Sequence, residues 1–305
     1  MPALKMAFGN RLETQHLLSG RVTIKGFEID FTDPGPAPAP TFNDTVTKLA
    51  YDVSELTAAN YIIAKDTGVP LIGLPVVPNV FYPLSGIMVN EAAGIKTAQD
   101  LAGKRVGVST GYASNPGVWL RGILSHQFDV SSERITWIEG EADSLTGVAY
   151  PRSSRYKTEK LTDLPARLIA GDIDALIGPG GAAAGDDKIG LFTTDPMPLT
   201  MEYFNATNVL PINTMLVMKE ATHAANPGLA NAVIAASLEA NALYHAEEKD
   251  DGLHQGLPVG ALRKAGLFPR PHGLETHGDA VRMLVQYLFE QGLIKKLWTL
   301  EELFV

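Results

Sequence analysis

Two acidic residues in the N-terminal part of the chain, Glu13 and Glu55, have positions suited to proton transfer. Glu13 and His16 lie one helical turn apart, so a carboxylate and an imidazole would share one helix face. Glu55 lies near the end of Tyr51–Leu56, a stretch that we expect to be a strand leading into a turn. A general acid requires such a group beside the reacting carbon. The alternatives are a first-turn carboxylate with a surface histidine, and, for Glu55, capping or ion pairing in a loop.

A second set of residues has the chemistry to bind an anion. The guanidinium of Arg11 would hold a carboxylate with two parallel hydrogen bonds, unless it forms a surface ion pair. Ser109–Ser114 precedes a predicted helix, where hydroxyls and free backbone amides bind anions. Arg121, on that helix, would pair internally or contact the ligand. The candidate binding residues are Asn10, Arg11, Tyr82, Ser109, Thr110, Gly111, Tyr112, Ser114, Gly180 and Asn213.

The glycine-rich stretch and the histidine pairs of the chain do not match the motifs of nucleotide-binding or metal-binding sites. Gly178–Gly181 lacks the Gly-Lys-Ser/Thr ending of a phosphate loop and is better explained as a cleft wall where backbone approaches ligand. His245 and His254 are nine residues apart, and His272 and His277 are five apart, so neither pair has the i, i+4 spacing of a helical zinc site. There is no cysteine and no Gly-x-Ser-x-Gly motif. We therefore expect no metal and no cofactor.

Strands alternate with helices along the chain, which predicts α/β architecture with mainly parallel sheets. The predicted strands cover 4–8, 26–31, 51–56, 70–77, 86–90, 104–109, 175–178 and 214–218. The predicted helices cover 45–50, a short segment from 97, the residues after 116, 162–170, 228–248 and 278–291. Ligands in such sheets lie beyond the carboxyl ends of the strands. The loops expected at that edge are Gly9–Glu13, Ser54–Thr57, Val77–Ser85, Ser109–Pro116, Gly178–Gly181 and Leu210–Asn213.

Length and charge narrow the class of protein. A chain of 305 residues exceeds one ordinary core, so two lobes are expected. The net charge of −9, from 25 basic and 34 acidic residues, argues against a nucleic-acid partner. The N-terminus has no pattern of a secretory leader, and no apolar run reaches the roughly 20 residues of a membrane helix. We expect a cytoplasmic protein that does not bind a membrane, with a homo-oligomer left open.

Several stretches together resemble the 4,5-dihydroxyphthalate decarboxylase family, whose fold is that of type II periplasmic binding proteins. They are Tyr51–Leu56, Gly86–Asn90 with Gly94 and Ile95, Asp100–Val108, Val118–Leu124, Gly273–Glu275, Tyr287, Glu290–Leu293 and Glu301–Phe304. The resemblance implies one lobe of residues 1–90 plus 213–305, a second of 91–212, two hinge crossings and a ligand cleft between the lobes. It also implies decarboxylation of an aromatic acid.

The chain departs from the family in the cleft loops. The first family loop carries an acidic–arginine pattern, where this chain has Asn10–Glu13. Where the family carries an Arg-His pair, this chain has Pro83 and Leu84, and Asn213 replaces a histidine. Proline and leucine supply no side-chain donor, and asparagine does not titrate. The resemblance therefore implies the family chemistry on a different substrate.

Together these features predict a cytoplasmic lyase, most simply a decarboxylase, acting on a small aromatic or cyclic carboxylic acid in the interlobe cleft. The alternative is a non-catalytic solute-binding protein for a small organic acid, serving a transporter or a sensor. A third hypothesis is another lyase or hydrolase that uses Glu13 or Glu55 as its base.

Overall fold

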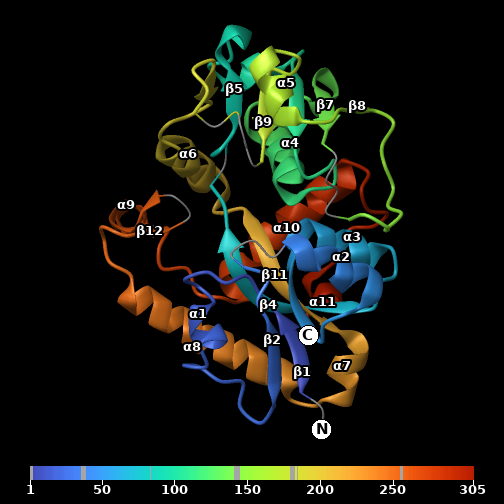
Figure 1. The fold of residues 1–305 in the computed structure, drawn as a ribbon, viewed down its shortest axis with the longest axis vertical. Helices are drawn as coiled ribbons and strands as arrows, with labels where there is room; N and C mark the ends of the chain where they lie inside the picture. The colour runs from blue at the N-terminus through green and yellow to red at the C-terminus, as the bar shows by residue number, and fades with distance from the viewer. Residues whose placement is uncertain are drawn as a thin grey trace.

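Two β-sheets, stacked along the long axis of the molecule, divide the chain into two lobes (Figure 1). The computed structural model describes residues 3–35, 39–82, 84–140, 145–178, 183, 185–254 and 257–305. The first sheet has the strand order β2-β1-β3-β11-β4, and the second has β10-β5-β9-β6-β7-β8. This architecture confirms the predicted two-lobed α/β fold.

The first lobe is built on β1, β2 and β3, which run parallel, and on β11, which is antiparallel to β3 and β4. Neighbouring residues of β11 point to opposite faces of the first sheet. Leu216 packs in the core beneath α8, and Val217 packs in the core beneath α3. The strands of the first lobe are β1 (Leu4–Ala7), β2 (Ile29–Thr32), β3 (Val53–Thr57), β4 (Leu71–Val80) and β11 (Ile212–Lys219). Its helices are α1 (Gln15–Leu18), α2 (Ala39–Lys48), α3 (Ala58–Asp66), α7 (Glu220–Ala225) and α8 (Leu229–Glu247).

The second lobe has a core of β6, β7 and β9 in parallel, with β5 antiparallel to β9. Its strands are β5 (Met88–Asn90), β6 (Arg105–Val108), β7 (Thr136–Glu139), β8 (Lys157–Lys160), β9 (Ala175–Ile177) and β10 (Ile189–Leu191). Its helices are α4 (Asn115–Gln127), α5 (Leu164–Ala170), α6 (Met197–Thr207) and the 3-10 turns η1 (Glu91–Ala93), η2 (Ala98–Leu101) and η3 (Ser132–Arg134).

The chain crosses between the sheets twice. The first crossing lies between Val80 of β4 and Met88 of β5, so residues 88–90 join the second sheet. The sequence had assigned those three residues to the first lobe. The second crossing runs from β10 through α6 to Ile212, the first residue of β11.

The C-terminal part of the chain ties the lobes together. Helix α10 (Leu274–Glu290) lies at the middle of the molecule and packs on both α3 and α4 (Figure 1). The α4 contact depends on Gly122, because a β-carbon there would lie 2.1 Å from the ring of Tyr287. The remaining elements are α9 (Val259–Lys264), α11 (Leu300–Leu303), β12 (Leu253–His254) and β13 (Leu257–Pro258).

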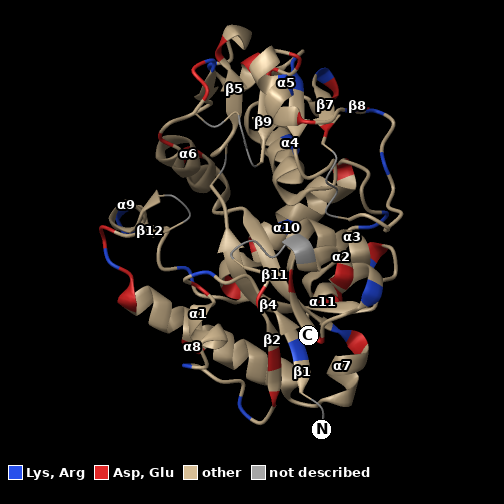
Figure 2. Cartoon of the chain, in the orientation of Figure 1, with Lys and Arg blue, Asp and Glu red and all other residues tan. Residues whose placement is uncertain are grey.

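Acidic and basic residues are interspersed over the outer elements of both lobes (Figure 2). Within the described part of the chain, no helix is both long enough and apolar enough to span a membrane.

Candidate functional site

The carboxyl ends of three strands meet at the inner edge of the first lobe. Strands β1, β3 and β4 all run in the same direction, because β3 and β4 are both antiparallel to β11. The loop from Gly9 to Glu13 therefore shares an edge with Thr57 and Tyr82, and β11 begins there with Ile212. This is the edge where ligands of α/β sheets bind.

Asn115, the first residue of α4, joins the second lobe to that edge. Its side-chain oxygen accepts a hydrogen bond from the amide of Ala59 at 3.0 Å, and its nitrogen donates to the carbonyl of Ile212 at 2.8 Å. The indole of Trp119 donates to the same carbonyl at 3.0 Å. These bonds place the N-terminus of α4 opposite the carboxyl edge of the first sheet.

Glu55 is completely buried and orients Arg11. Its Oε1 lies 2.6 Å from Nη2 of Arg11 and accepts a hydrogen bond from the hydroxyl of Thr214 at 2.5 Å. Its Oε2 accepts from the amide of Gly9 at 2.9 Å. With both oxygens engaged, the carboxylate acts as an anchor for the guanidinium, the ion-pairing role that the sequence had left as an alternative to acid catalysis.

The first turn of α4 has the features of an anion site. Ser114 is its N-cap, yet its buried hydroxyl makes no hydrogen bond, and Nη1 of buried Arg121 also lacks a partner. These two atoms lie 3.1 and 3.2 Å from the point where Gly117 would carry a β-carbon. Two polar atoms without partners therefore converge on a helix N-terminus, where the backbone amides also favour negative charge.

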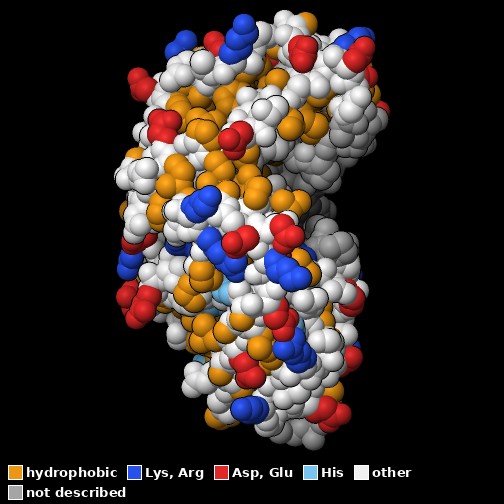
Figure 3. Space-filling view, turned by 90° about the vertical axis from the view of Figure 1, so that its left-hand side faces the viewer, with side chains coloured by type: hydrophobic (Ala, Val, Ile, Leu, Met, Phe, Trp, Pro, Cys, Tyr) orange, Lys and Arg blue, Asp and Glu red, His pale blue; other side chains and the backbone are white. Residues whose placement is uncertain are grey.

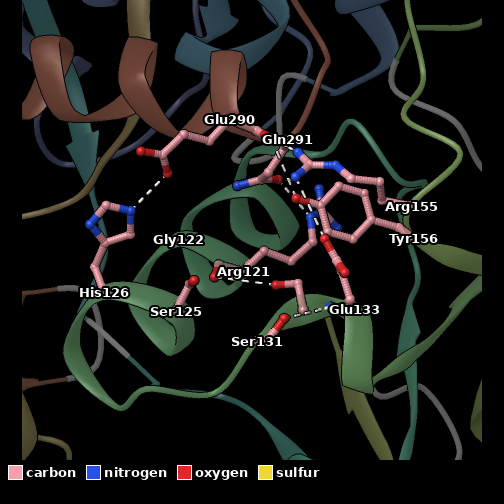
Figure 4. A pocket seen from close by; sticks show the side chains of 11 residues that line it. Arg121, Gly122, Ser125, His126, Ser131, Glu133, Arg155, Tyr156, Glu290 and Gln291 are labelled. Atoms are coloured by element: carbon pink, nitrogen blue, oxygen red, sulfur yellow. Dashed lines mark hydrogen bonds and ion pairs between the residues drawn. The ribbon is translucent and has the colours of Figure 1, made fainter.

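Arg121 carries a positive charge that makes no ion pair with any described residue. Its Nε donates to Oε1 of Gln291 at 2.6 Å (Figure 4). Its Nη2 donates to the carbonyl of Tyr112 at 2.5 Å. The ring of Tyr112 lies 4.0 Å below the guanidinium. Burial lowers the pKa of Arg121. A buried cation without a counter-ion is costly, so an anion bound near this helix end would relieve that cost.

The other predicted residues of the second lobe lie around the same turn. The hydroxyl of Ser109 has no hydrogen-bond partner and lies 3.3 Å from the β position of Gly178. Thr110 and Gly111 continue the turn, and the buried hydroxyl of Tyr112 also has no partner. Burial raises the pKa of Tyr112 to about 12.

The predicted binding residues of the first lobe differ in burial and in their hydrogen-bond partners. Asn213 accepts a weak hydrogen bond of 3.4 Å from Asn115, and Tyr82 is buried after the end of β4. Asn10 donates to Asp33 at 2.8 Å on the exposed side of its loop. Gly180 and Pro83 lie outside the described residues, and so does most of Gly178–Gly181.

Glu13 and His16 each have a partner outside the predicted pair. Nε2 of His16 lies 3.2 Å from the carboxylate of Glu247 at the end of α8. Oε1 of Glu13 lies 3.5 Å from Nδ1 of His254, which also contacts the hydroxyl of Tyr244 at 2.8 Å. The acid–imidazole contact of Glu13 is therefore with His254 of β12, a residue that sequence spacing does not connect to it.

A polar pocket between α4, η3 and the end of α10 is a weaker candidate (Figure 4). His126 contacts Glu290 at 2.7 Å, and Arg155 lies 3.6 Å from Glu133 and donates to the carbonyl of Glu290 at 2.7 Å. Apart from Arg121, its charged side chains thus satisfy one another. Among the described residues, no three acidic or histidine side chains are arranged to hold a metal ion.

Known proteins resemble the chain in sequence and in fold. A family model described as NMT1/THI5-like matches residues 28–149. A Comamonas testosteroni protein named 4,5-dihydroxyphthalate decarboxylase is 27% identical over 243 residues, which cover 76% of this chain and 73% of that protein.

Two solved structures share the fold over the whole chain. The aliphatic sulphonate binding protein SsuA of Escherichia coli aligns with a TM-score of 0.59 at 18% identity and is covered over 92% of its length. A mutant of the desulfurization enzyme DszB, bound to biphenyl-2-sulfinic acid, aligns with a TM-score of 0.59 at 15% identity and 97% coverage. These likenesses confirm the fold predicted from the sequence.

Proposed function

We propose that this chain, a divergent member of the 4,5-dihydroxyphthalate decarboxylase family, binds a small aromatic or cyclic carboxylic acid between its lobes and decarboxylates it. The observation that supports this most is the anion site at the first turn of α4, where Ser114 and Arg121 present buried polar atoms without partners. Arg11, fixed by Glu55, supplies a second cation at the facing edge. A carboxylate held between them would be oriented for reaction.

The reaction needs no cofactor in principle. The bond between the ring carbon and the carboxylate breaks, its electron pair stays on the ring carbon, a proton bonds to that carbon, and carbon dioxide leaves. A ring hydroxyl would help by feeding electrons into the ring during protonation. Glu13, in contact with His254, is our candidate proton donor, because both oxygens of Glu55 are engaged in holding Arg11.

Solute binding without turnover is the second candidate function. The fold is shared with a sulphonate binding protein, and Glu55 serves Arg11 as an anchor. A binding protein needs only the anion site and the two lobes that close on the ligand.

The two functions are distinguished by measuring turnover and binding together. The purified protein is incubated with hydroxybenzoates and phthalates, including 4,5-dihydroxyphthalate, while carbon dioxide release and calorimetric binding are followed. We expect turnover of at least one acid, lost in Glu13→Gln while binding persists, with Glu247→Gln as the exposed control. Tight binding without turnover would establish the binding protein, and no binding of any acid would overturn both.

A further inference from the structure

The carboxamide of Gln291, at the end of α10, holds the guanidinium of Arg121. Its Oε1 accepts a hydrogen bond from Nε of Arg121 at 2.6 Å (Figure 4). Its Nε2 donates to the carbonyl of Val118 at 2.9 Å. Gln291 is 3% exposed and Arg121 is 1% exposed, so water does not compete for these bonds. The C-terminal helix thus fixes a charged side chain of the second lobe.

Two glycines allow this contact. Helix α10 ends before Gln291 because Gly292 adopts a left-handed φ of 68°. One turn earlier, the ring of Tyr287 fills the space where Gly122 of α4 has no side chain. The side chain of Gln291 therefore lies against α4 at the level of Arg121.

The two bonds of Gln291 determine how Arg121 is oriented. Because Nε2 of Gln291 donates to Val118, its Oε1 faces Arg121 and accepts from it. Nη2 of Arg121 donates to the carbonyl of Tyr112 at 2.5 Å. The remaining group, Nη1, has no hydrogen-bond partner and lies 3.2 Å from the β position of Gly117, in the first turn of α4. Arg121 is thus held with Nη1 at the anion site.

The partner of Arg121 is neutral, in contrast to that of Arg11. Arg11 is held by the carboxylate of Glu55, so this pair has no net charge. Among the described residues, no acidic side chain lies within ion-pairing distance of Arg121. Glu139, whose charge acts on Arg121 from farther away, is itself paired with Arg152 at 2.7 Å. The amide therefore holds the guanidinium and leaves its positive charge for a ligand.

The surface shown in Figure 3 contributes little attraction for an anion. Basic and acidic side chains are intermixed over it, and the formal net charge of the chain is −9. Binding of an anion therefore depends on local cations such as Arg121.

We propose that Gln291 is a positioning residue of the anion site, which orients Arg121 and, being neutral, keeps its positive charge available to the carboxylate of the ligand. This role rests on the anion site proposed above, but not on turnover. It predicts that a negative charge at this position preserves the stability of the protein and weakens the site, two effects that a purely structural contact would not combine.

Gln291→Glu is the main variant, because it keeps the shape and puts a carboxylate beside the buried guanidinium. We expect a thermal midpoint at or above that of the wild type, since the buried cation gains a counter-ion. Binding of hydroxybenzoates and phthalates, followed by calorimetry, should weaken at least about tenfold, because the new charge neutralises Arg121 and repels the ligand. The matched control is Gln99→Glu, at an exposed glutamine whose amide donates to the carbonyl of Phe128 at the other end of α4. It should leave binding and midpoint unchanged.

Gln291→Met tests the orientation separately from the charge. Methionine is close in size to glutamine but has no amide, so the charge of Arg121 stays and its hydrogen bond is lost. We expect the same acids to bind roughly tenfold more weakly, with a lower midpoint, because Arg121 and Val118 both lose a partner.

The results separate this role from the proposed function. Equal acid binding in the wild type and Gln291→Glu would overturn the role of Gln291 and leave the anion site in place. Weaker binding with a midpoint far below that of the wild type in Gln291→Glu would also overturn it, because Gln291 would then be only a packing contact. If the wild type binds none of the acids, the anion site itself is wrong, and this role with it.

Discussion

Arg11 and Glu55 form a 2.6 Å ion pair at the edge of the first lobe that faces the start of α4. The carboxylate is completely buried, whereas the guanidinium side chain is 14% exposed. Glu55 thus holds the Arg11 guanidinium through Nη2. The binding role proposed for Arg11 therefore depends on this anchor.

Replacing Glu55 by Gln should destabilise the protein and weaken binding of the organic acid. The variant leaves Arg11 without its counter-ion, which we expect to cost about 2–4 kcal/mol of unfolding free energy in urea titrations. The control is Glu220→Gln, whose ion pair with Lys65 lies at the surface and should contribute less than about 1 kcal/mol. Unchanged acid binding with lost turnover would instead make Glu55 the proton donor.

Asn115→Ala should loosen the contact between the lobes. It removes the acceptor of the Ala59 amide and the donor to Ile212 in a buried setting. We expect a loss of about 2 kcal/mol in unfolding free energy and weaker ligand binding. Asn226→Ala, which removes a local hydrogen bond at the end of α7, is the comparison and should be nearly neutral. Equal effects of the two substitutions would contradict the bridging role of Asn115.

Gly122→Ala should disturb the packing of α4 on α10. The added β-carbon would lie 2.1 Å from the ring of Tyr287, so one helix has to move. Overpacking of this kind costs roughly 1–3 kcal/mol, measured as a lower thermal midpoint. Ser125→Ala, on the same helix and exposed, should change the midpoint little (Figure 4). A stable Gly122→Ala protein would show that the two helices pack less closely than described.

Two buried histidines, His272 and His277, and two half-buried ones, His245 and His254, predict sensitivity to acid. Burial lowers the pKa of His245, His254 and His272 to about 4 and that of His277 to about 3. The unfolded chain therefore binds more protons as pH falls below about 6.5, and stability, complete above that value, declines toward pH 4. Each fully buried histidine adds roughly 1.4 kcal/mol per pH unit to the slope.

This slope is measured by urea unfolding at a series of pH values. His277→Asn should reduce it by about one proton, whereas His223→Asn, exposed on α7, should leave it unchanged. The same slope in both variants would mean that His277 titrates normally in the folded protein.

Local patterns predicted many of the elements, but not α3, β7, β8, β10 or α6. Strand β3 and the long helices α8 and α10 were predicted within a few residues of their observed positions, at 51–56, 228–248 and 278–291. Strand β8 was missed, since Lys157–Lys160 is an exposed edge segment without an apolar residue. Helix α2 begins at Ala39, six residues before the predicted helix 45–50, because proline is tolerated in a first helical turn.

The candidate site was predicted only in part, because its contacts join distant parts of the chain. Arg11 and Glu55 were identified from their residue types and from their positions relative to predicted strands. They are 44 residues apart in the sequence, so their spacing does not predict that they form an ion pair. His254, which contacts Glu13, lies in the two-residue strand β12, which is too short for periodicity to mark a functional side chain.

A crystal structure with the tightest-binding acid of the panel tests the central claim most directly. We predict its carboxylate between the lobes, within about 3 Å of the hydroxyl of Ser114 or the amide of Gly117, with Arg11 on the facing side. An acid bound elsewhere, with only water at the first turn of α4, would contradict the proposed site.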